Sequence, residues 1–440
     1  MTWHLLRRGS HRMKTVAVVS AVVMVAAAGS NAKSQEATRH MNEVLEWNQI
    51  FIDSLIATGT PNSSSQRLGA IVHAAIFDAF NGIERRYTPI FFRDTAPQGT
   101  SRRAAVIAAA YRTLVGLFPT RQPVLEILFK QSIGNLGEDV EGGPTIAGAR
   151  DRGIAWGISV AEAVLASRAA DGFNVPYPAF IGGDELGRWR PIAPATSMSA
   201  RGLASTLPFV VTSWDQFRPI PPRGLSTETY LDDFTAVKQL GRKIGSTRTG
   251  EETALAPFWE GNASVHWNQA ANQIARANDL SMSAANRMLA VLNVAMADTA
   301  ITTWSAKLFY GSTAGEVTWR PFTAITIADD GLLETEQDSS WVPLVNTPSH
   351  PEYPAGHPSL NGAAATILLS YFADRQVFTL TTLGQPSRTY SSISQAREDG
   401  NNARVWGGMH FPSTVAISNA EGEAIATWVN LNAMQRPTDQ

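Results

Sequence analysis

The amino-acid sequence of 440 residues predicts a mostly α-helical fold with long irregular loops. Two observations support this prediction. Apolar residues recur at steps of three and four along much of the chain, which is the period of a helix with one buried face. Stretches with the alternating pattern of β-strands are sparse. Because 44% of the residues are hydrophobic, the chain can build a large core, and we expect a helical bundle.

The first residues of the chain have the pattern of a secretory signal peptide. Positions 7, 8, 12 and 14 are basic, an almost entirely apolar run follows at 16–28, and the small residues Ser30-Asn31-Ala32 come next. A charged start, an apolar run too short to span a bilayer comfortably and a small-residue cleavage site are typical of such peptides. We therefore expect residues 1–32 to be removed and a single domain, residues 33–440, to be exported to the periplasm or secreted. No other stretch of the sequence is apolar enough to span a membrane.

The helical pattern begins near Met41 and continues to about Ala170. It is clearest at residues 66–80, 102–118 and 147–170. Residues 172–226 differ, because they hold eight of the 24 prolines together with many glycines and serines. That composition predicts a long irregular segment, and loops of this length in a compact domain are usually functional or wrap the surface.

The helical pattern returns at residues 227–240 and continues through a helix at residues 283–307. Ser281 or Ser283 is expected to cap the second of these helices, because a hydroxyl can accept the free N–H groups of a first turn. By the same rule, Ser359 is expected to cap a helix over residues 360–372. Ser413 is expected to cap the last helix, which should end near Met434.

Charge and cysteine content exclude several classes of function. The formal net charge of −2 argues against a nucleic-acid surface and against a basic membrane patch. The chain contains no cysteine, which excludes disulfides, zinc–thiolate sites, iron–sulfur clusters and thiol catalysis.

Positive charge gathers locally in the last third of this nearly neutral chain. The residues concerned are Lys307, Arg320, Gly356, His357, Arg404 and His410. Arginine offers a planar fork of donors to anion oxygens, lysine a point charge, and histidine can be a ligand, a nucleophile or a proton shuttle. Together these residue types predict a site for a tetrahedral oxyanion such as phosphate or vanadate.

Two of these segments are expected to lie at helix starts. Gly356 and His357 directly precede the predicted helix at 360–372, where free N–H groups and the helix dipole favour an anion. Glycine lets the backbone approach such a ligand closely. His410 is followed by Pro412, at the expected start of the last helix.

In this order along the chain, the residues resemble the active-site motif of the vanadium-dependent haloperoxidases and of their relatives, the type 2 phosphatidic-acid phosphatases. The flanking sequences at 71–78, 304–307, 319–321, 341–344 and 349–354 resemble the bacterial haloperoxidase-like branch. The resemblance covers most of the chain after residue 32, with the motifs concentrated in 304–414. It implies a mostly α, helical-bundle domain of the vanadium haloperoxidase and acid phosphatase type.

The resemblance also implies roles for the clustered residues. Lys307, Arg320 and Arg404 would neutralise the oxygens of a bound vanadate, for whose place phosphate would compete. The N–H of Gly356 would add a hydrogen bond to the oxyanion. His410 would coordinate vanadium as the one metal ligand from the protein.

Further residues would belong to catalysis by the same resemblance. His357 would be the acid–base group, and Trp304 and His350 would line the halide side of the pocket. The implied partners are hydrogen peroxide, a halide and a small organic acceptor, and His350 favours bromide or iodide. Relatives are often dimers, which makes a homodimer possible.

Three departures from the family pattern affect these expectations. Ala355 stands where the family usually has serine, so one hydroxyl to the oxyanion is missing, which costs about 1.5–3 kcal/mol. Thr414 stands where the family usually has aspartate, so the imidazole of His410 is expected to be less basic. Lys307 and Arg320 are thirteen residues apart rather than seven, with residues 311–317 as an apparent insertion.

Two other functions use the same residues. In an acid phosphatase, His410 would attack phosphorus and His357 would protonate the leaving group. A non-catalytic phosphate-binding relative would explain Ala355 and Thr414 as decay of the site.

Three polar residues on predicted helices lie outside the motif. His73 and Asp78 are five residues apart, which does not place them on one helix face, so we expect separate structural roles for them. Asp298 either supports an arginine of the site or occupies an ordinary polar helix position.

Overall fold

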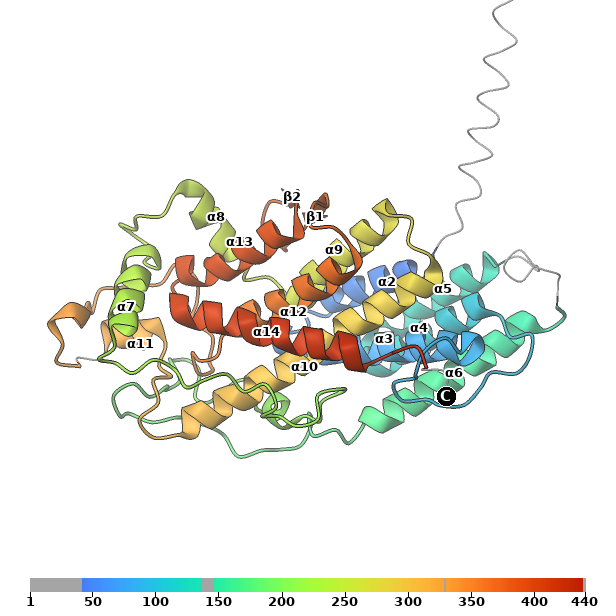
Figure 1. Cartoon of the computed structure of the whole chain (residues 1–440), viewed down its shortest axis with the longest axis horizontal. Helices are drawn as coiled ribbons and strands as arrows, with labels where there is room; N and C mark the ends of the chain where they lie inside the picture. Colours follow the sequence, from blue (N-terminus) through green and yellow to red (C-terminus); the bar gives the residue numbers. More distant parts are fainter. Residues whose placement is uncertain (1–41, 137–145, 328–329, 438–440) are drawn as a thin grey trace, which may run out of the picture. The chain divides into compact units, whose positions relative to one another are not determined.

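The computed structural model describes residues 42–136, 146–327 and 330–437. The predicted signal peptide, residues 1–32, lies outside the described residues. Residues from Glu43 onward form one unit, and the prediction of a mostly α-helical fold is confirmed (Figure 1). The first half of this unit contains α2 (Glu43–Ala57), α3 (Asn62–Glu84), α4 (Arg102–Leu117), α5 (Gln122–Gly134) and α6 (Ala149–Arg168).

The second half contains most of the candidate functional residues. Its helices are α7 (Glu228–Leu240), α8 (Gly250–Phe258), α9 (Ala263–Ala277), α10 (Met282–Ser312), α11 (Pro321–Thr326), α12 (Gly356–Tyr371), α13 (Ile393–Trp406) and α14 (Pro412–Asn432). Two short antiparallel strands, β1 (Phe378–Leu380) and β2 (Arg388–Tyr390), form a hairpin between α12 and α13. The sequence analysis gave no individual bounds for α2, α5, α8 and α9, and α11 and α13 lie outside the stretches predicted to be helical.

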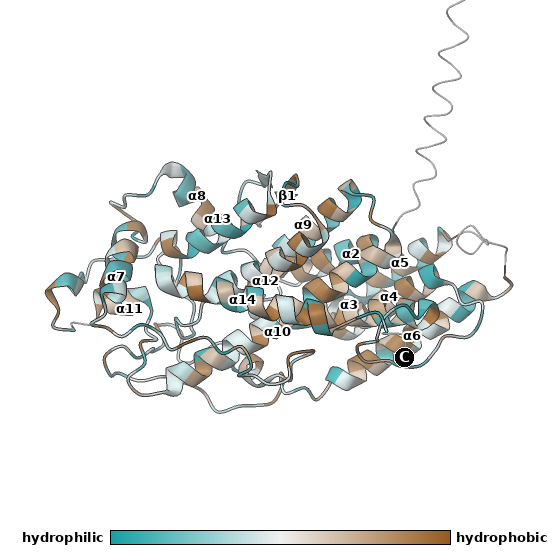
Figure 2. Ribbon diagram, viewed as in Figure 1, coloured by the Kyte–Doolittle hydropathy of each residue, from teal (hydrophilic) through white to brown (hydrophobic). Residues whose placement is uncertain are grey.

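The long helix α10 connects two helical bundles. In the first bundle α3, α4 and α6 pack on one another, and in the second α12 packs on α14 and α13. Helix α10 contacts α3 on one side and α12 and α14 on the other. Apolar residues, brown in Figure 2, are concentrated where these helices run beside one another. The shared core explains why no boundary between the bundles is visible in the sequence.

Helix starts agree only partly with the predicted caps. The prediction for α10 is confirmed, because Ser281 accepts a first-turn N–H, and Thr227, for which no cap was predicted, caps α7 in the same way. The other two predicted caps are wrong. Helix α12 begins at Gly356, so Ser359 lies inside it and donates to the carbonyl of Ala355 at 2.9 Å. Helix α14 begins with Pro412, a residue suited to a first position, and not after Ser413.

Two buried aspartates hold extended loop segments against the bundles in the same way. Asp78 on α3 accepts the N–H groups of residues 90, 91 and 92 at 2.7–2.9 Å. Asp298 on α10 accepts those of residues 209, 210 and 211 at 2.6–2.9 Å. Each aspartate follows an arginine, Arg67 or Arg287, by eleven residues. In these contacts α3 and α10 therefore have equivalent roles in their bundles.

Hydrogen bonds also show the roles of the three polar residues outside the motif, His73, Asp78 and Asp298. His73 contacts Asn48 through its Nε2 at 2.9 Å, so His73 and Asp78 have separate structural roles, as predicted. Asp298 holds the loop at 209–211 and makes no hydrogen bond to an arginine of the candidate site among the described residues.

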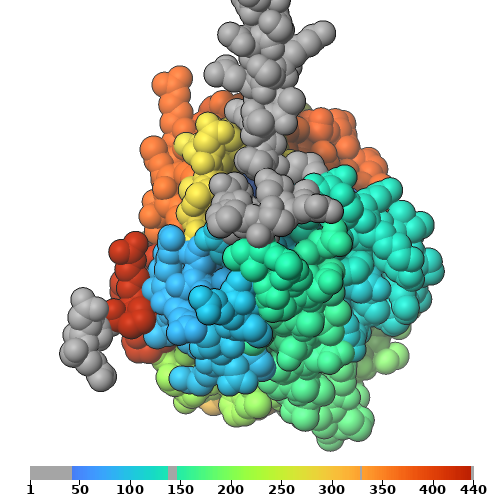
Figure 3. All heavy atoms as spheres, turned by 90° about the vertical axis from the view of Figure 1, so that its right-hand side faces the viewer, coloured from blue at the N-terminus to red at the C-terminus, as the bar shows by residue number. Residues whose placement is uncertain are grey.

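Residues 172–226 form the predicted irregular segment, in which the only described helical turn is a 3₁₀ turn at Arg201–Ser205. Seen from the side of α4 to α6, the surface is covered mainly by the blue-to-green first half of the chain (Figure 3). Within the described ranges, helices with both the length and the apolar content to cross a membrane are absent.

We predict that Asp298→Asn lowers the free energy of unfolding by about 1–3 kcal/mol, because an amide NH₂ would face N–H groups that need an acceptor. Urea denaturation measures this change. Asp53→Asn is the control, since Asp53 is exposed and should change stability by less than about 0.5 kcal/mol. Equal stability of both variants would contradict the assigned role of Asp298.

Candidate active site

The predicted site residues surround a cavity of about 230 Å³. Its walls come from both bundles and from the loops between them. The lining residues are Asn62, Ser63, Ser199, Glu260, Trp304, Asn346, Pro348, His350, Gly356, His357, Arg404, Met409 and His410. Six of the eight predicted site residues therefore line this cavity. The other two, Lys307 and Arg320, contact the loops that form it.

The start of α12 contributes Gly356 and His357 to the cavity. They are the first two residues of the helix, whose N–H groups have no partner within the helix. A side chain at Gly356 would place its Cβ 3.0 Å from the Trp304 ring, so glycine is needed for the helix start to lie against α10. Donors and the positive end of the helix dipole therefore face the cavity, as an anion requires.

The turn between α13 and α14 fixes Arg404 relative to His410. The carbonyl of Arg404 accepts the N–H groups of Met409 at 3.0 Å and His410 at 3.3 Å. Gly408 has a φ of +77°, and a Cβ there would lie 2.8 Å from the carbonyl oxygen of Gly241. This closed turn explains why two glycines separate the arginine from the histidine.

Arg404 has an unused donor inside the protein. Its Nη1 donates to the carbonyl of Trp259 at 3.2 Å, and its Nη2 contacts the sulfur of Met409 at 2.9 Å. Its Nε is buried and has no partner among the described residues, and the same is true of the indole N–H of Trp304. Buried donors without partners are uncommon in native proteins, and both of these side chains line the cavity.

His410 is held in a defined orientation and protonation state. Its Nδ1–H donates to Oε1 of Glu352 at 2.9 Å, and its Nε2 accepts from Nη1 of Arg320 at 3.0 Å. Burial, followed by the charge of Arg320, lowers the pKa of His410 well below its usual range. The ring is therefore neutral, with its proton on Nδ1, and its Nε2 lone pair accepts from Arg320, a hydrogen bond that a metal or phosphorus at Nε2 would have to replace.

Glu352 is a functional residue that the sequence analysis missed. Its carboxylate also accepts the N–H of Phe411 at 3.1 Å and the hydroxyl of Thr414 at 3.0 Å. Burial raises the pKa of Glu352, but three donors and the nearby Arg320 favour the ionised form. The expectation that His410 lacks a carboxylate partner is therefore wrong: Glu352 supplies it from another segment, and Thr414 holds Glu352.

Lys307 and Arg320 direct their donors to the loop before α12. The ammonium of Lys307 donates to the carbonyls of Pro351 at 2.6 Å, Glu352 at 3.1 Å and Pro354. Arg320 donates through Nε to the carbonyl of His350 at 2.9 Å. Both side chains are fully buried. In this arrangement Lys307 has no free N–H for a ligand, so it acts on the cavity through its charge and through the loop that it holds.

The thirteen-residue spacing between Lys307 and Arg320 has a simple structural explanation. Helix α10 continues to Ser312, and residues 312–316, the middle of the apparent insertion, are exposed or half-buried. The added residues therefore protrude from the surface, while both cations still reach the loop at 350–354. The unusual spacing is therefore compatible with a place for Lys307 beside the cavity.

The remaining predicted residues also lie in the cavity wall. The rings of Trp304 and His350 are 5.1 Å apart. His350 accepts from Nη2 of Arg320 through its Nδ1 at 2.8 Å. The Nε2–H of His357 donates to the carbonyl of Gly261 at 3.1 Å, which leaves its Nδ1 as an acceptor. Burial lowers the pKa of His350 and of His357 well below the usual range, so both rings are neutral.

The charges around the cavity favour an anionic guest. Three buried cations, Lys307, Arg320 and Arg404, lie near two buried carboxylates, Glu352 and Glu421, and near the more exposed carboxylate of Glu260, which lines the cavity. Burial lowers the pKa of Arg320 to about 9 and that of Arg404 to about 10, which expresses the cost of holding positive charge away from water. A bound oxyanion would offset this cost and accept the unused donors. The residues therefore fit a tetrahedral oxyanion of phosphate or vanadate type.

Solved structures of bacterial haloperoxidases have the same fold. The structure of a bacterial vanadium-dependent iodoperoxidase matches with a TM-score of 0.75 and 21% identity, over 90% of this chain and 98% of that chain. A bacterial vanadium-dependent chloroperoxidase matches with a TM-score of 0.63 in its holo form, at 17% identity, and in its apo form, at 18% identity. These matches cover 84% of this chain and 91% and 94% of the other chains. None of the curated proteins matches the chain by sequence.

The sequence itself matches one family model. Residues 287–437, which contain all the predicted site residues, match the VCPO second helical-bundle domain. This part of the chain is therefore similar to a haloperoxidase domain, and residues from Glu43 onward have the helical fold of the solved bacterial haloperoxidases.

We predict that Arg404→Lys weakens binding of inorganic phosphate about tenfold or more, because lysine cannot offer the Nε donor and loses a hydrogen bond to a charged group. Isothermal titration calorimetry measures the affinity. The matched control is Arg397→Lys on the same helix, since Arg397 pairs with Glu423 outside the cavity. An unchanged phosphate affinity in Arg404→Lys would show that the anion does not contact this arginine.

Proposed function

We propose that the protein is a vanadate-dependent haloperoxidase that oxidises a halide with hydrogen peroxide. The observation that carries this proposal is the match of residues 287–437 to a haloperoxidase domain, together with the neutral His410, whose Nδ1–H donates to Glu352 and whose Nε2 accepts from Arg320. When bound, vanadate would supply a Lewis acid that activates peroxide toward halide. His410 would hold vanadium, and Arg404 and the N–H of Gly356 would bind its oxygens.

The other residues of the cavity would support this reaction without contacting vanadium. Arg320 and Lys307 would stabilise negative charge in a site largely removed from water, where such stabilisation is strong. His357 would exchange a proton through Nδ1, because its Nε2–H is engaged by Gly261. The neighbouring rings of Trp304 and His350 would form the halide side of the pocket.

Some finer parts of the proposal rest on the sequence. The neutral, polar ring of His350 favours bromide or iodide over chloride. Export from the cell rests on the signal-peptide pattern at residues 1–32. A homodimer is expected only from the resemblance to the family.

An acid phosphatase is the second candidate, and one contact favours it. A phosphorylated-histidine mechanism needs a basic imidazole, and the carboxylate of Glu352 provides the partner that Thr414 does not. The structure thus removes one reason to prefer the haloperoxidase, and the preference rests on the family match and on the flanking motifs.

One pair of assays is expected to decide between these functions. We predict that bromide or iodide and peroxide halogenate a phenol only when vanadate is added, and that phosphate blocks this activity. His410→Ala should abolish it, because the metal ligand is lost. Product formation is followed by absorbance, beside hydrolysis of 4-nitrophenyl phosphate.

Each alternative has its own outcome in the same assays. Hydrolysis of the aryl phosphate without halide oxidation would make the protein a phosphatase. Inactivity in both assays would indicate a non-catalytic phosphate-binding protein. Vanadate-dependent turnover in His410→Ala would mean that the ligand is wrongly assigned.

We predict further that Glu352→Gln weakens vanadate binding about 10–100-fold, because the partner that orients a metal-ligating histidine is lost. Calorimetric titration with orthovanadate measures the change in affinity. The control is Glu423→Gln, which removes one carboxylate from the outer part of α14. Adding Thr414→Asp to Glu352→Gln returns a carboxylate to the same place, since the hydroxyl of Thr414 lies 3.0 Å from Oε2 of Glu352. The double variant should recover most of the affinity. If Glu352→Gln binds vanadate like the unmodified protein, the carboxylate does not orient the histidine.

A further inference from the structure

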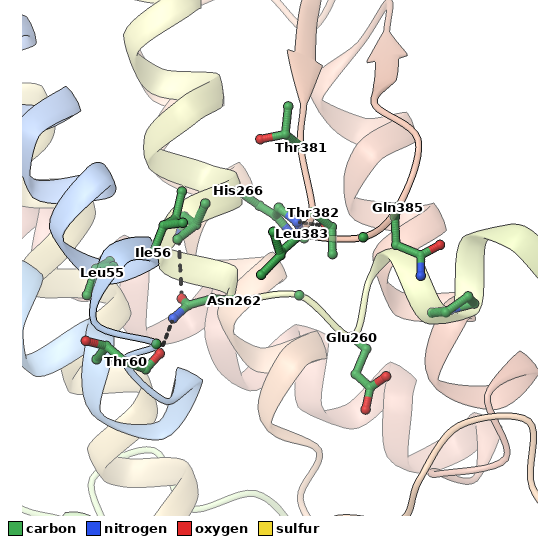
Figure 4. A pocket seen from close by; sticks show the side chains of 15 residues that line it. Leu55, Ile56, Thr60, Glu260, Asn262, His266, Thr381, Thr382, Leu383 and Gln385 are labelled. Carbon is green, nitrogen blue, oxygen red and sulfur yellow. Dashed lines mark hydrogen bonds between the residues drawn. The ribbon is translucent and has the colours of Figure 1, made fainter.

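A second, larger cavity adjoins the candidate active site. We propose that it binds the organic acceptor of the reaction, an electron-rich aromatic molecule of the phenol class. This inference rests on the proposed haloperoxidase function. The cavity is formed by the end of α2, the α8–α9 connection and the loop between β1 and β2, as Figure 4 shows.

The volumes of the two cavities indicate which of them can hold an organic molecule. Pockets for organic ligands usually have volumes of about 300–1,000 Å³. The cavity around His410 has a volume of about 230 Å³, which suits an oxyanion, peroxide and halide but leaves little room for an aromatic ring. The second cavity has a volume of about 680 Å³, within the usual range.

The two cavities share a wall. Glu260 lines both of them, and the next residue, Gly261, lines the larger one and accepts the Nε2–H of His357 through its carbonyl. The α8–α9 connection is thus the partition between the sites. A molecule in the larger cavity would lie one residue of backbone away from the group expected to act as acid and base.

The lining of the larger cavity has the character of a site for an amphipathic molecule. Leu55, Pro257 and Val265 provide apolar walls. Ile56 and Leu383 provide an apolar rim, although they are 46% and 92% exposed. Apolar side chains that are left in water beside a cavity often mark a binding site. They would cover the ring of a bound phenol.

The larger cavity is also lined by polar side chains, those of His266, Thr382 and Glu260. His266 is buried and stacks on Phe258 with ring centroids 5.3 Å apart, and burial lowers its pKa to about 4, so it presents a neutral ring. The hydroxyl of Thr382 donates to the carbonyl of Phe258 at 2.9 Å and therefore accepts from Nε2 of His266 at 2.7 Å. The carboxylate of Glu260 points away from His266, Thr382 and Leu383 in Figure 4, and it interacts electrostatically with Arg404 of the smaller cavity.

The chemistry of the proposed step is balanced. Hypohalous acid, the product of halide oxidation, would transfer its halogen to a ring carbon of the acceptor. A carbon–halogen bond forms, the oxygen–halogen bond breaks, and the ring proton leaves with the hydroxide as water. An acceptor bound beside the smaller cavity would be held close to the place where the oxidant is released.

The test uses rim variants and thymol, an apolar phenol, as the probe. Leu383→Glu places a charge on the rim and Ile56→Trp fills the space, so each should weaken thymol binding about tenfold. Calorimetry measures binding without turnover, and the KM for thymol in the halogenation assay should rise in parallel. Oxidation of iodide to triiodide, which needs no organic acceptor, should be unchanged.

Matched controls use equally exposed residues away from the cavity. Leu333→Glu resembles Leu383→Glu, since the two leucines are 94% and 92% exposed, and Ile127→Trp resembles Ile56→Trp. The proposal is overturned if thymol binds both rim variants as tightly as it binds the controls, or if halogenation never saturates with thymol. If no variant oxidises iodide, the haloperoxidase function fails, while the binding measurement still tests the cavity.

Discussion

The organisation of the site depends on the burial of three positive charges in a helical core. Lys307, Arg320 and Arg404 are at most 2% exposed, and isolated buried charges are very unfavourable. The protein compensates with backbone carbonyls around Lys307 and Arg320 and with the carboxylates of Glu352 and Glu421. This compensation is incomplete near Arg404, where a buried donor has no partner among the described residues. A preorganised, positively charged cavity results, and its donors need not rearrange when an oxyanion enters.

The same arrangement explains why one scaffold can be considered for two chemistries. A neutral His410, oriented by Glu352 and surrounded by cations, could bind vanadium or attack phosphorus. The cations and the helix start at Gly356 would stabilise either oxyanion. The difference between a peroxidase and a phosphatase therefore lies less in this inner set of groups than in the walls that admit halide, peroxide or organic molecules.

The fold class could be predicted from the sequence because it depends on local patterns, whereas the six predicted residues that line the cavity were found through clustered charge and through the resemblance of short motifs to a known family. The steps of three and four apolar residues locate α3, α4 and α6, and the hydroxyl of Ser281 marks the start of α10. Helix α13 was not recognised, since its polar sequence has few apolar residues to reveal a period. Glu352 was missed for a different reason: its contact with His410 joins residues 58 positions apart. The sequence does hold a signal of it, since Glu352 is the acidic residue of the flanking motif at 349–354.

The closed turn between Arg404 and His410 determines where the chain can tolerate changes of length. The N–H groups of Met409 and His410 both donate to the carbonyl of Arg404. A Cβ on Gly408 would lie close to the backbone of Gly241. A single inserted or deleted residue there would rotate the imidazole out of the cavity. By contrast, residues 312–316 protrude into solvent, so the polypeptide can lengthen there without moving Lys307 or Arg320. Insertions, natural or engineered, should therefore be tolerated at residues 312–316 and not in the turn between Arg404 and His410.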